Sequence, residues 1–187
     1  SCQSKYYYKI AGPVKKYIGI PQGILEDYKD RFTYVKVFCD LGDGVYICPH
    51  TTKGLEERGK HAHMYGITDD RILVDDFSHE QTLVFEEEDG LYLFNSCAHG
   101  GVENIIEEIK EVFPDKEIKA FCGGFHRMGT MGVDTCSFTE DEVKEVGRTL
   151  LCSSDAVFYT GHCTGNIAAG CLKEVMGERF IPLKSGL

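Results

Sequence analysis

Several features are missing from this chain of 187 residues, and each absence removes a class of protein. No run of apolar residues approaches the roughly 18 that a membrane-spanning helix needs. The first six residues also lack the apolar core of a signal peptide, so we expect a cytoplasmic protein. Positive charge is scarce, because the chain has 20 Lys and Arg but 30 Asp and Glu. Nucleic acids and anionic membranes attract clustered cations, so neither is an expected partner.

Paired cysteines are missing too. The chain has nine cysteines, but none forms a Cys-x-x-Cys pair, and most lie inside apolar segments. This pattern predicts reduced, buried thiols in a cytosolic protein. Cys97 and Cys163 differ from the others because each stands beside a histidine. Either one is a soft metal ligand or a small residue that fills a tight turn, and both interpretations stay open.

No internal repeat, low-complexity tract or linker divides the chain. The hydrophobic share of 42% and the charged share of 27% are those of an ordinary globular protein. We therefore expect one domain over residues 1–187, with strands first and then alternating strands and helices, an α/β (α+β) arrangement.

Strand patterns dominate the first part of the chain. Alternating apolar residues in 32–41 and 44–48 flank a Gly-Asp-Gly turn and predict a hairpin. Residues 82–86 and 91–94 surround an acidic turn and predict a second one. We expect a short helix or irregular segment over residues 1–30 and a polar loop over 50–70.

Helical patterns appear in the second part. Apolar residues at positions 102, 105, 106, 109 and 112 predict an amphipathic helix over 102–113. Thr139 and the acids after it predict the start of another helix, which runs to Leu151, and a third follows Asn166. Residues 119–122 and 156–160 read as buried strands. Pro182 marks 179–183 as an edge strand, because proline cannot donate to a ladder.

Three histidines follow strand patterns at equivalent places. Each predicted strand over 91–94, 119–122 and 156–159 runs into a glycine-containing turn, and the turns carry His99, His126 and His162. Parallel strands place their carboxyl ends along one edge of a sheet, so these imidazoles are expected to converge there. Imidazole is both a common metal ligand and the usual acid or base near neutral pH. Together they predict a site.

Four short motifs resemble a known family. They are Asp-Asp-Phe at 75–77 with Glu80, Ser-Cys-Ala-His-Gly-Gly at 96–101, Gly-Gly-Phe-His at 123–126 and His-Cys-Thr-Gly at 162–165. In this order they resemble the metallo-β-lactamase-fold metal-dependent hydrolases, in the subgroup similar to 7,8-dihydropterin-6-methyl-4-(ribofuranosyl)aminobenzene-5′-phosphate synthase. The resemblance implies an αββα sandwich with a metal centre, typically of two ions, that activates water. The cofactor it implies is zinc, with manganese and iron as alternatives.

The resemblance also assigns roles to residues. His99 and His162 would each ligate a metal ion, and His126 would act at the rim of the site as a catalytic hydrogen-bond or proton donor. Thr164 and Gly165 open a helix whose free N–H groups suit an anion, so they are the expected substrate-binding residues for a phosphorylated small molecule. Thr164 could equally be only the helix cap.

Other polar residues near the motifs have less certain roles. Asp76 and Glu80 could orient the ligand histidines, or Glu80 could face solvent. His50 and His79 read as surface residues. His61 and His63 form the one His-x-His pair of the sequence, and they read as loop residues rather than ligands.

One family motif is absent. The sequence His-x-His-x-Asp-His, which supplies most of the family's ligands, does not occur here. The chain therefore resembles the C-terminal two-thirds of the fold, and we expect it to be inactive alone. A second chain could then supply the missing N-terminal half.

Three functions follow from these patterns. The first is a metal-dependent hydrolase, or a related synthase, that acts on a phosphorylated or ester substrate. The second is a non-catalytic binding or regulatory relative with a degenerate metal site. The third is a thiol or flavin enzyme that uses Cys97 or Cys163.

Overall fold

A seven-stranded sheet forms the centre of the protein. The structure is a computed structural model that describes residues 6–68, 71–129 and 132–183. The strands of this sheet are β3 (Cys39–Gly42), β4 (Val45–Pro49), β7 (Gln81–Glu87), β8 (Gly90–Cys97), β9 (Ile118–Gly124), β12 (Val157–Thr160) and β13 (Phe180–Pro182). Their order is β13-β12-β9-β8-β7-β4-β3. The β8, β9, β12 and β13 strands run parallel to their neighbours in this series, and the remaining pairs are antiparallel.

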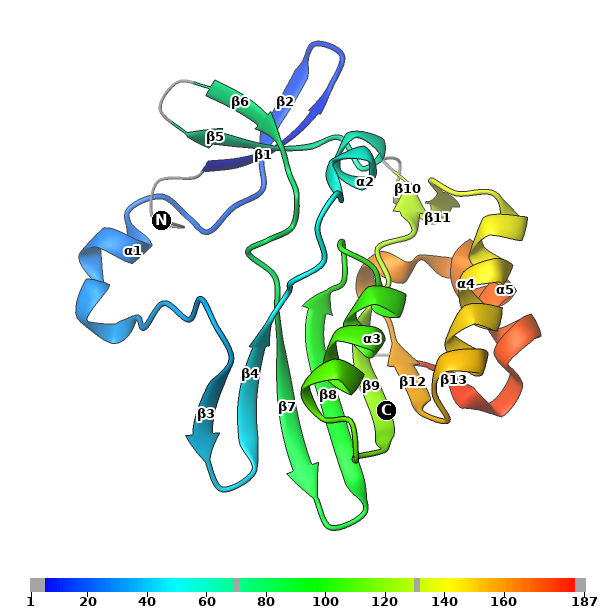
Figure 1. The fold of residues 1–187 in the computed structure, drawn as a ribbon. Coiled ribbons are helices and arrows are strands. Elements are labelled where there is room, and N and C mark those ends of the chain that lie inside the picture. Colours follow the sequence, from blue (N-terminus) through cyan, green and yellow to red (C-terminus); the bar gives the residue numbers. More distant parts are fainter. Residues whose placement is uncertain (1–5, 69–70, 130–131, 184–187) are drawn as a thin grey trace.

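Two smaller sheets lie at one end of the large one, at the top of Figure 1. The first contains β1 (Tyr6–Ala11), β2 (Val14–Tyr17), β5 (Met64–Thr68) and β6 (Arg71–Val74), in the order β2-β1-β5-β6. All its strand pairs are antiparallel. The second consists of β10 (Met128–Gly129) and β11 (Gly132–Cys136).

The longer helices follow the strands of the parallel part. The helices are α1 (Ile24–Asp27), α2 (Glu56–His61), α3 (Val102–Val112), α4 (Glu140–Ser153) and α5 (Asn166–Met176), with the 3-10 turns η2 (Lys29–Arg31), η3 (His162–Thr164) and η4 (Gly177–Arg179). The α4 helix begins after Thr139, the N-cap that the sequence predicted, and the structure adds a reciprocal capping box between Thr139 and Glu142. Within the described residues, no helix combines the length and the apolar character needed to cross a membrane.

Most predicted elements are present. Both hairpins form, as β3–β4 and β7–β8, and the three helices of the second half form as α3, α4 and α5. The predicted edge strand is β13, at the end of the large sheet. The loop predicted over 50–70 is wrong, because this segment contains α2 and β5. The N-terminal segment was expected to be helical or irregular, but it forms the β1–β2 hairpin before the short α1.

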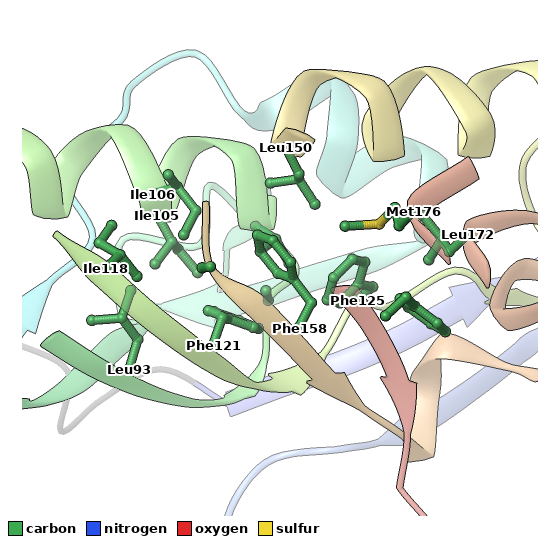
Figure 2. Packing of buried hydrophobic residues seen from close by; sticks show 14 of the residues in the cluster. Leu93, Ile105, Ile106, Ile118, Phe121, Phe125, Leu150, Phe158, Leu172 and Met176 are labelled. Atoms are coloured by element: carbon green, nitrogen blue, oxygen red, sulfur yellow. The ribbon is translucent and has the colours of Figure 1, made fainter. Parts of the chain in front are cut away.

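The face of the large sheet that carries the helices is buried over five of its seven strands. One row of paired residues crosses five strands, and each member is at most 1% exposed: Val84, Leu93, Phe121, Phe158 and Phe180. Figure 2 shows Phe121, Phe125 and Phe158 packed between these strands and residues of the helices, among them Leu150 and Met176. Burial of these large side chains stabilises the fold through the hydrophobic effect.

The opposite face is apolar but open. A second row of paired residues crosses all seven strands of the sheet: Cys39, Ile47, Leu83, Phe94, Cys122, Tyr159 and Ile181. Phe94 is 44% exposed, and the other six are partly exposed. A shallow hollow of about 400 Å³ lies over this face between Phe94 and Leu183. A sheet face of this composition is normally covered.

His50 is a buried residue, which corrects the prediction that it lies on the surface. Its Nδ1 lies 2.8 Å from a carboxylate oxygen of Glu108 on α3, and its backbone N–H donates to the carbonyl of Glu80. The ring presses against Gly100, where an added Cβ would lie 2.2 Å from Nε2. Only glycine fits there, so His50 supports the turn that carries His99.

The stability of the protein should fall in acid because of Glu108. Burial by itself raises the pKa of this carboxyl. Hydrogen bonds from His50, Thr52 and the Thr51 backbone outweigh that effect and lower the pKa to about 2. A depressed carboxyl pKa contributes stability above its unfolded value, and that contribution is lost as the pH falls through the folded value. We expect a loss on the order of 2–3 kcal/mol between about pH 5 and pH 2.

Urea unfolding at a series of pH values measures this effect. Glu108→Gln should be less stable than the wild type at pH 7 and should show a flatter pH dependence below pH 5. The exposed Glu111→Gln on the same helix is the matched control. Equal acid sensitivity of wild type and Glu108→Gln would contradict the assignment.

Candidate metal centre

Three turns meet at one edge of the large sheet. The β8, β9 and β12 strands are parallel neighbours and end at Cys97, Gly124 and Thr160. The turns that follow them carry His99, His126 and His162, as the sequence predicted. The turns are bonded to one another, since the Ala98 N–H donates to the Gly124 carbonyl over 2.8 Å.

Cys97, His99 and His126 form a compact group of possible metal donors. One sulfur or nitrogen atom from each lies within 4.8 Å of the others. The imidazole centroids of His99 and His126 are 4.2 Å apart, and the Cys97 Sγ lies 3.4 Å from the Nδ1 of His126. A backbone φ of 45° at His126, which is unusual for a residue other than glycine, directs its side chain.

Glu80 holds the His99 turn in place. Its buried carboxylate lies 2.5 Å from the Nδ1 of His99 and accepts the backbone N–H groups of His99 and Gly100, both over 2.9 Å. Because a carboxylate only accepts, Nδ1 carries the proton and Nε2 keeps a free lone pair. A histidine ligand needs an acceptor of this kind to set its tautomer. The sequence left open whether Glu80 faces solvent; it does not.

The third turn meets the other two through Cys163. The backbone N–H of Arg127 donates to the Cys163 carbonyl over 3.0 Å. An added Cβ at Gly124 would lie 2.4 Å from the Cys163 sulfur, so the close approach depends on glycine at that position. The backbone of His162 begins η3, but its side chain lies outside the described part of the structure. Convergence of His99 and His162 stays a prediction.

The electrostatic environment disfavours the charged forms of Cys97 and His126. A hydrogen bond with Cys163 raises the pKa of the Cys97 thiol, and burial raises it further. Burial lowers the pKa of His126, and the charges of His99 and Lys9 act in the same direction. A nucleophilic cysteine needs a depressed pKa, so this arrangement does not favour a thiol enzyme that uses Cys97.

The two predicted substrate-binding residues lie in the core beside this edge. The Thr164 side chain is 1% exposed, and its hydroxyl accepts the backbone N–H of Phe125 over 3.0 Å. It also shares a hydrogen bond with the hydroxyl of Thr160. Thr164 therefore connects the second and third turns. Gly165 is buried and forms the N-cap of α5. Contact of either residue with a substrate stays a prediction.

The remaining candidate residues surround the cluster. Asp76 accepts the backbone N–H and the hydroxyl of Ser78, so it shapes its own turn. Phe77 beside it is fully buried and stacks on His99, with centroids 5.5 Å apart. His79 is partly exposed and contacts Tyr7 and Asp75. His61 lies 2.7 Å from the Ser137 carbonyl at Nε2.

Sequence reasoning left two members of the site undecided. Cys97 had a packing and a ligand interpretation, and His126 was placed at the rim rather than in the donor group. The local signals were the spacing of Cys97 and His99 on one turn and the histidine after two glycines. Neither signal reports the distance between turns, which depends on strand register.

Comparisons with known proteins agree with this geometry. Over 123 residues the chain is 27% identical to 7,8-dihydropterin-6-methyl-4-(β-D-ribofuranosyl)-aminobenzene-5′-phosphate synthase of Methanocaldococcus jannaschii. The aligned region covers 66% of this chain and 39% of that relative. A crystal structure of a metal-dependent hydrolase of the β-lactamase superfamily matches with a TM-score of 0.76 and 22% identity. That match covers 98% of this chain and 66% of the other. No protein-family profile matches.

The predicted fold and resemblance are confirmed by these comparisons. The chain has the mixed α/β fold of the metallo-β-lactamase superfamily, and it is similar to the synthase in sequence. It spans about two-fifths of the length of that curated relative and about two-thirds of the structural one.

Proposed function

We propose that this chain is part of a metal-dependent hydrolase, or a related synthase, that acts on a phosphorylated or ester substrate. The observation that carries the proposal is the donor group of Cys97, His99 and His126 with Glu80 behind it. The similarity to a synthase and to a metal-dependent hydrolase supports it. No observation favours the alternative of a non-catalytic relative, because three neighbouring donors and an oriented imidazole are more than a degenerate site retains.

The donors suit zinc. Zinc in catalytic sites takes three nitrogen, sulfur or oxygen ligands from the protein and leaves a further position open. The thiol favours zinc over manganese, which prefers oxygen ligands. A divalent ion bound there would supply Lewis acidity and activate water. His99 would bind through the Nε2 that Glu80 leaves free, and His162 remains a proposed ligand of a second ion.

His126 has a position suited to catalysis. Its ring borders both the donor group and a cavity of about 340 Å³. Its lowered pKa favours neutral imidazole, the form that binds a metal. We therefore assign His126 as a ligand that also touches the bound substrate. Thr164 and Gly165 would contact the substrate through their backbone groups at the start of α5, because the Thr164 hydroxyl is already hydrogen-bonded within the protein.

The open face of the large sheet is the proposed contact for the rest of the enzyme. The row from Cys39 to Ile181 leaves apolar side chains uncovered on seven strands, and the structural relative is longer than this chain. The occupant would be the N-terminal part of the fold, which carries further metal ligands, either in the same polypeptide or in a second chain. A cytoplasmic location and a single domain over residues 1–187 are also proposals.

Cobalt titration tests the metal site directly. Co²⁺ replaces zinc in mixed thiolate and imidazole sites and gives a thiolate-to-metal charge-transfer absorption when a cysteine is bound. We expect the chain to bind one Co²⁺ at this group and to show that absorption, because Cys97 loses its proton when it ligates a metal.

Cys97→Ser should remove the charge-transfer absorption. The matched control is Cys122→Ser, which replaces a partly exposed free thiol on the neighbouring strand β9 and should leave the spectrum unchanged. A wild-type spectrum in Cys97→Ser, or no Co²⁺ binding by the wild type, would overturn the proposed site.

A further inference from the structure

The cavity beside His126 has an unusual charge for this protein. It encloses about 340 Å³ between the β1–β5 part of the small sheet and the turns after β9 and β11. Its lining residues are Lys9, His61, Ala62, His63, His126, Met128, Ser137 and Phe138. None of them is acidic, although the chain has a net charge of −10. The cavity therefore concentrates positive and hydrogen-bonding groups in an acidic protein.

Two of the lining side chains, those of Lys9 and His63, are available to a ligand. Within the described residues, the Lys9 ammonium forms no salt bridge, and the His63 side chain has no hydrogen-bond partner. Both are placed by the backbone of the small sheet, because Lys9 pairs with Met64 and the Ile10 N–H donates to the His63 carbonyl over 2.9 Å. A φ of 56° at His63 sets the direction of its side chain.

His61 and Arg127 contact the Phe138 ring, which lines the cavity. The His61 ring stacks on Phe138 with centroids 4.6 Å apart, while the Arg127 guanidinium lies 4.3 Å from the centroid of the same ring. Arg127 is 5% exposed, and it shares the carboxylate of Glu103 with Arg58. The Glu142 carboxylate also acts electrostatically on Arg127 and His61, so these charges offset one another, and the positive charge that the cavity offers an anion comes from Lys9.

We propose that this cavity binds the phosphate group of a phosphorylated substrate through Lys9 and His63, with the bond to be cleaved at His126. As a substrate subsite the cavity rests on the proposed function, but its affinity for phosphate does not. The proposal places the anion here rather than at the start of α5, where the Thr164 hydroxyl is buried and bonded. The volume is within the range of small-molecule sites.

Titration of the full chain with inorganic phosphate tests the proposal. The protein is first treated with a chelator, because a bound metal ion would itself attract phosphate. We expect saturable binding that Lys9→Gln weakens by roughly tenfold, the value of one charge-assisted hydrogen bond. His63→Asn should weaken it less, and Lys9→Arg should largely retain it.

Lys15→Gln is the matched control. It removes the same charge from the neighbouring strand β2, where the exposed Lys15 lies over the Tyr8 ring, and it should leave phosphate affinity within about twofold. Circular dichroism checks that each variant is folded. Absence of saturable binding, or equal losses in Lys9→Gln and Lys15→Gln, would overturn the proposal.

The two proposals can fail separately. Phosphate binding that depends on Lys9, in a protein that binds no Co²⁺, would support the cavity and contradict the metal site. Co²⁺ binding at Cys97 without phosphate binding that depends on Lys9 would overturn the cavity and leave the metal site intact.

Discussion

Glu80→Gln should lower the metal affinity of this protein by roughly 10–100-fold, because the carboxylate sets the tautomer and orientation of His99. The amide oxygen of glutamine can accept at most the two His99 groups now bonded to one carboxylate oxygen, and its NH₂ group would then face the Gly100 N–H, which is another donor. Because residue 80 is buried, water does not replace the lost hydrogen bond. We also expect a loss of about 2–3 kcal/mol in the free energy of unfolding.

Co²⁺ titration and urea unfolding measure the two effects. Glu87→Gln, at the exposed end of the same strand-turn unit, removes the same charge and should change neither quantity appreciably. If Glu80→Gln bound Co²⁺ with wild-type affinity, the assignment of His99 as a ligand oriented by Glu80 would be wrong.

Two adjacent substitutions on β8 should differ strongly in their effect on the free energy of unfolding. Leu93 is 1% exposed beneath the helices, and Phe94 is 44% exposed on the open face. Leu93→Gln removes buried apolar surface and leaves an amide without partners, so we expect a loss of about 3–5 kcal/mol. Phe94→Gln should change the stability of this chain by less than about 1 kcal/mol.

Phe94→Gln should instead weaken association with the N-terminal part of the fold. Urea unfolding of the single chain and a binding assay with that part, expressed as a separate polypeptide, measure the two quantities. The proposed contact is contradicted if Phe94→Gln associates as tightly as the wild type while remaining folded. A large stability loss in Phe94→Gln would show that the face is already covered within residues 1–187.

Local patterns in the sequence were sufficient for much of the fold. The N-cap at Thr139 and the Gly-Asp-Gly turn before β4 each act over a few residues, so they could be recognised without tertiary information. The three histidines could be placed at one edge for a related reason. Parallel strands bring equivalent positions together wherever they pair, and His99, His126 and His162 each follow such a strand.

Contacts between distant segments could not be predicted in the same way. The β5 strand lies in a polar stretch and forms because it pairs with β1 and β6, so its residues looked like a loop. His50 can be buried because Glu108, 58 residues away, accepts a hydrogen bond from its ring. No periodicity in the sequence reports either partner.

The donor group shows the same division at the site itself. The sequence placed His99 after its strand, but the distances to Cys97 and His126 depend on the β8–β9 register, which shifts between Phe94 and Cys97. Lys9 and His63 line a cavity together with His126 because the small sheet lies at this end of the large one. Short-range sterics and hydrogen bonds decide where each element begins and ends. Which side chains then meet is decided by long-range pairing and burial, and those interactions exist only in the folded chain.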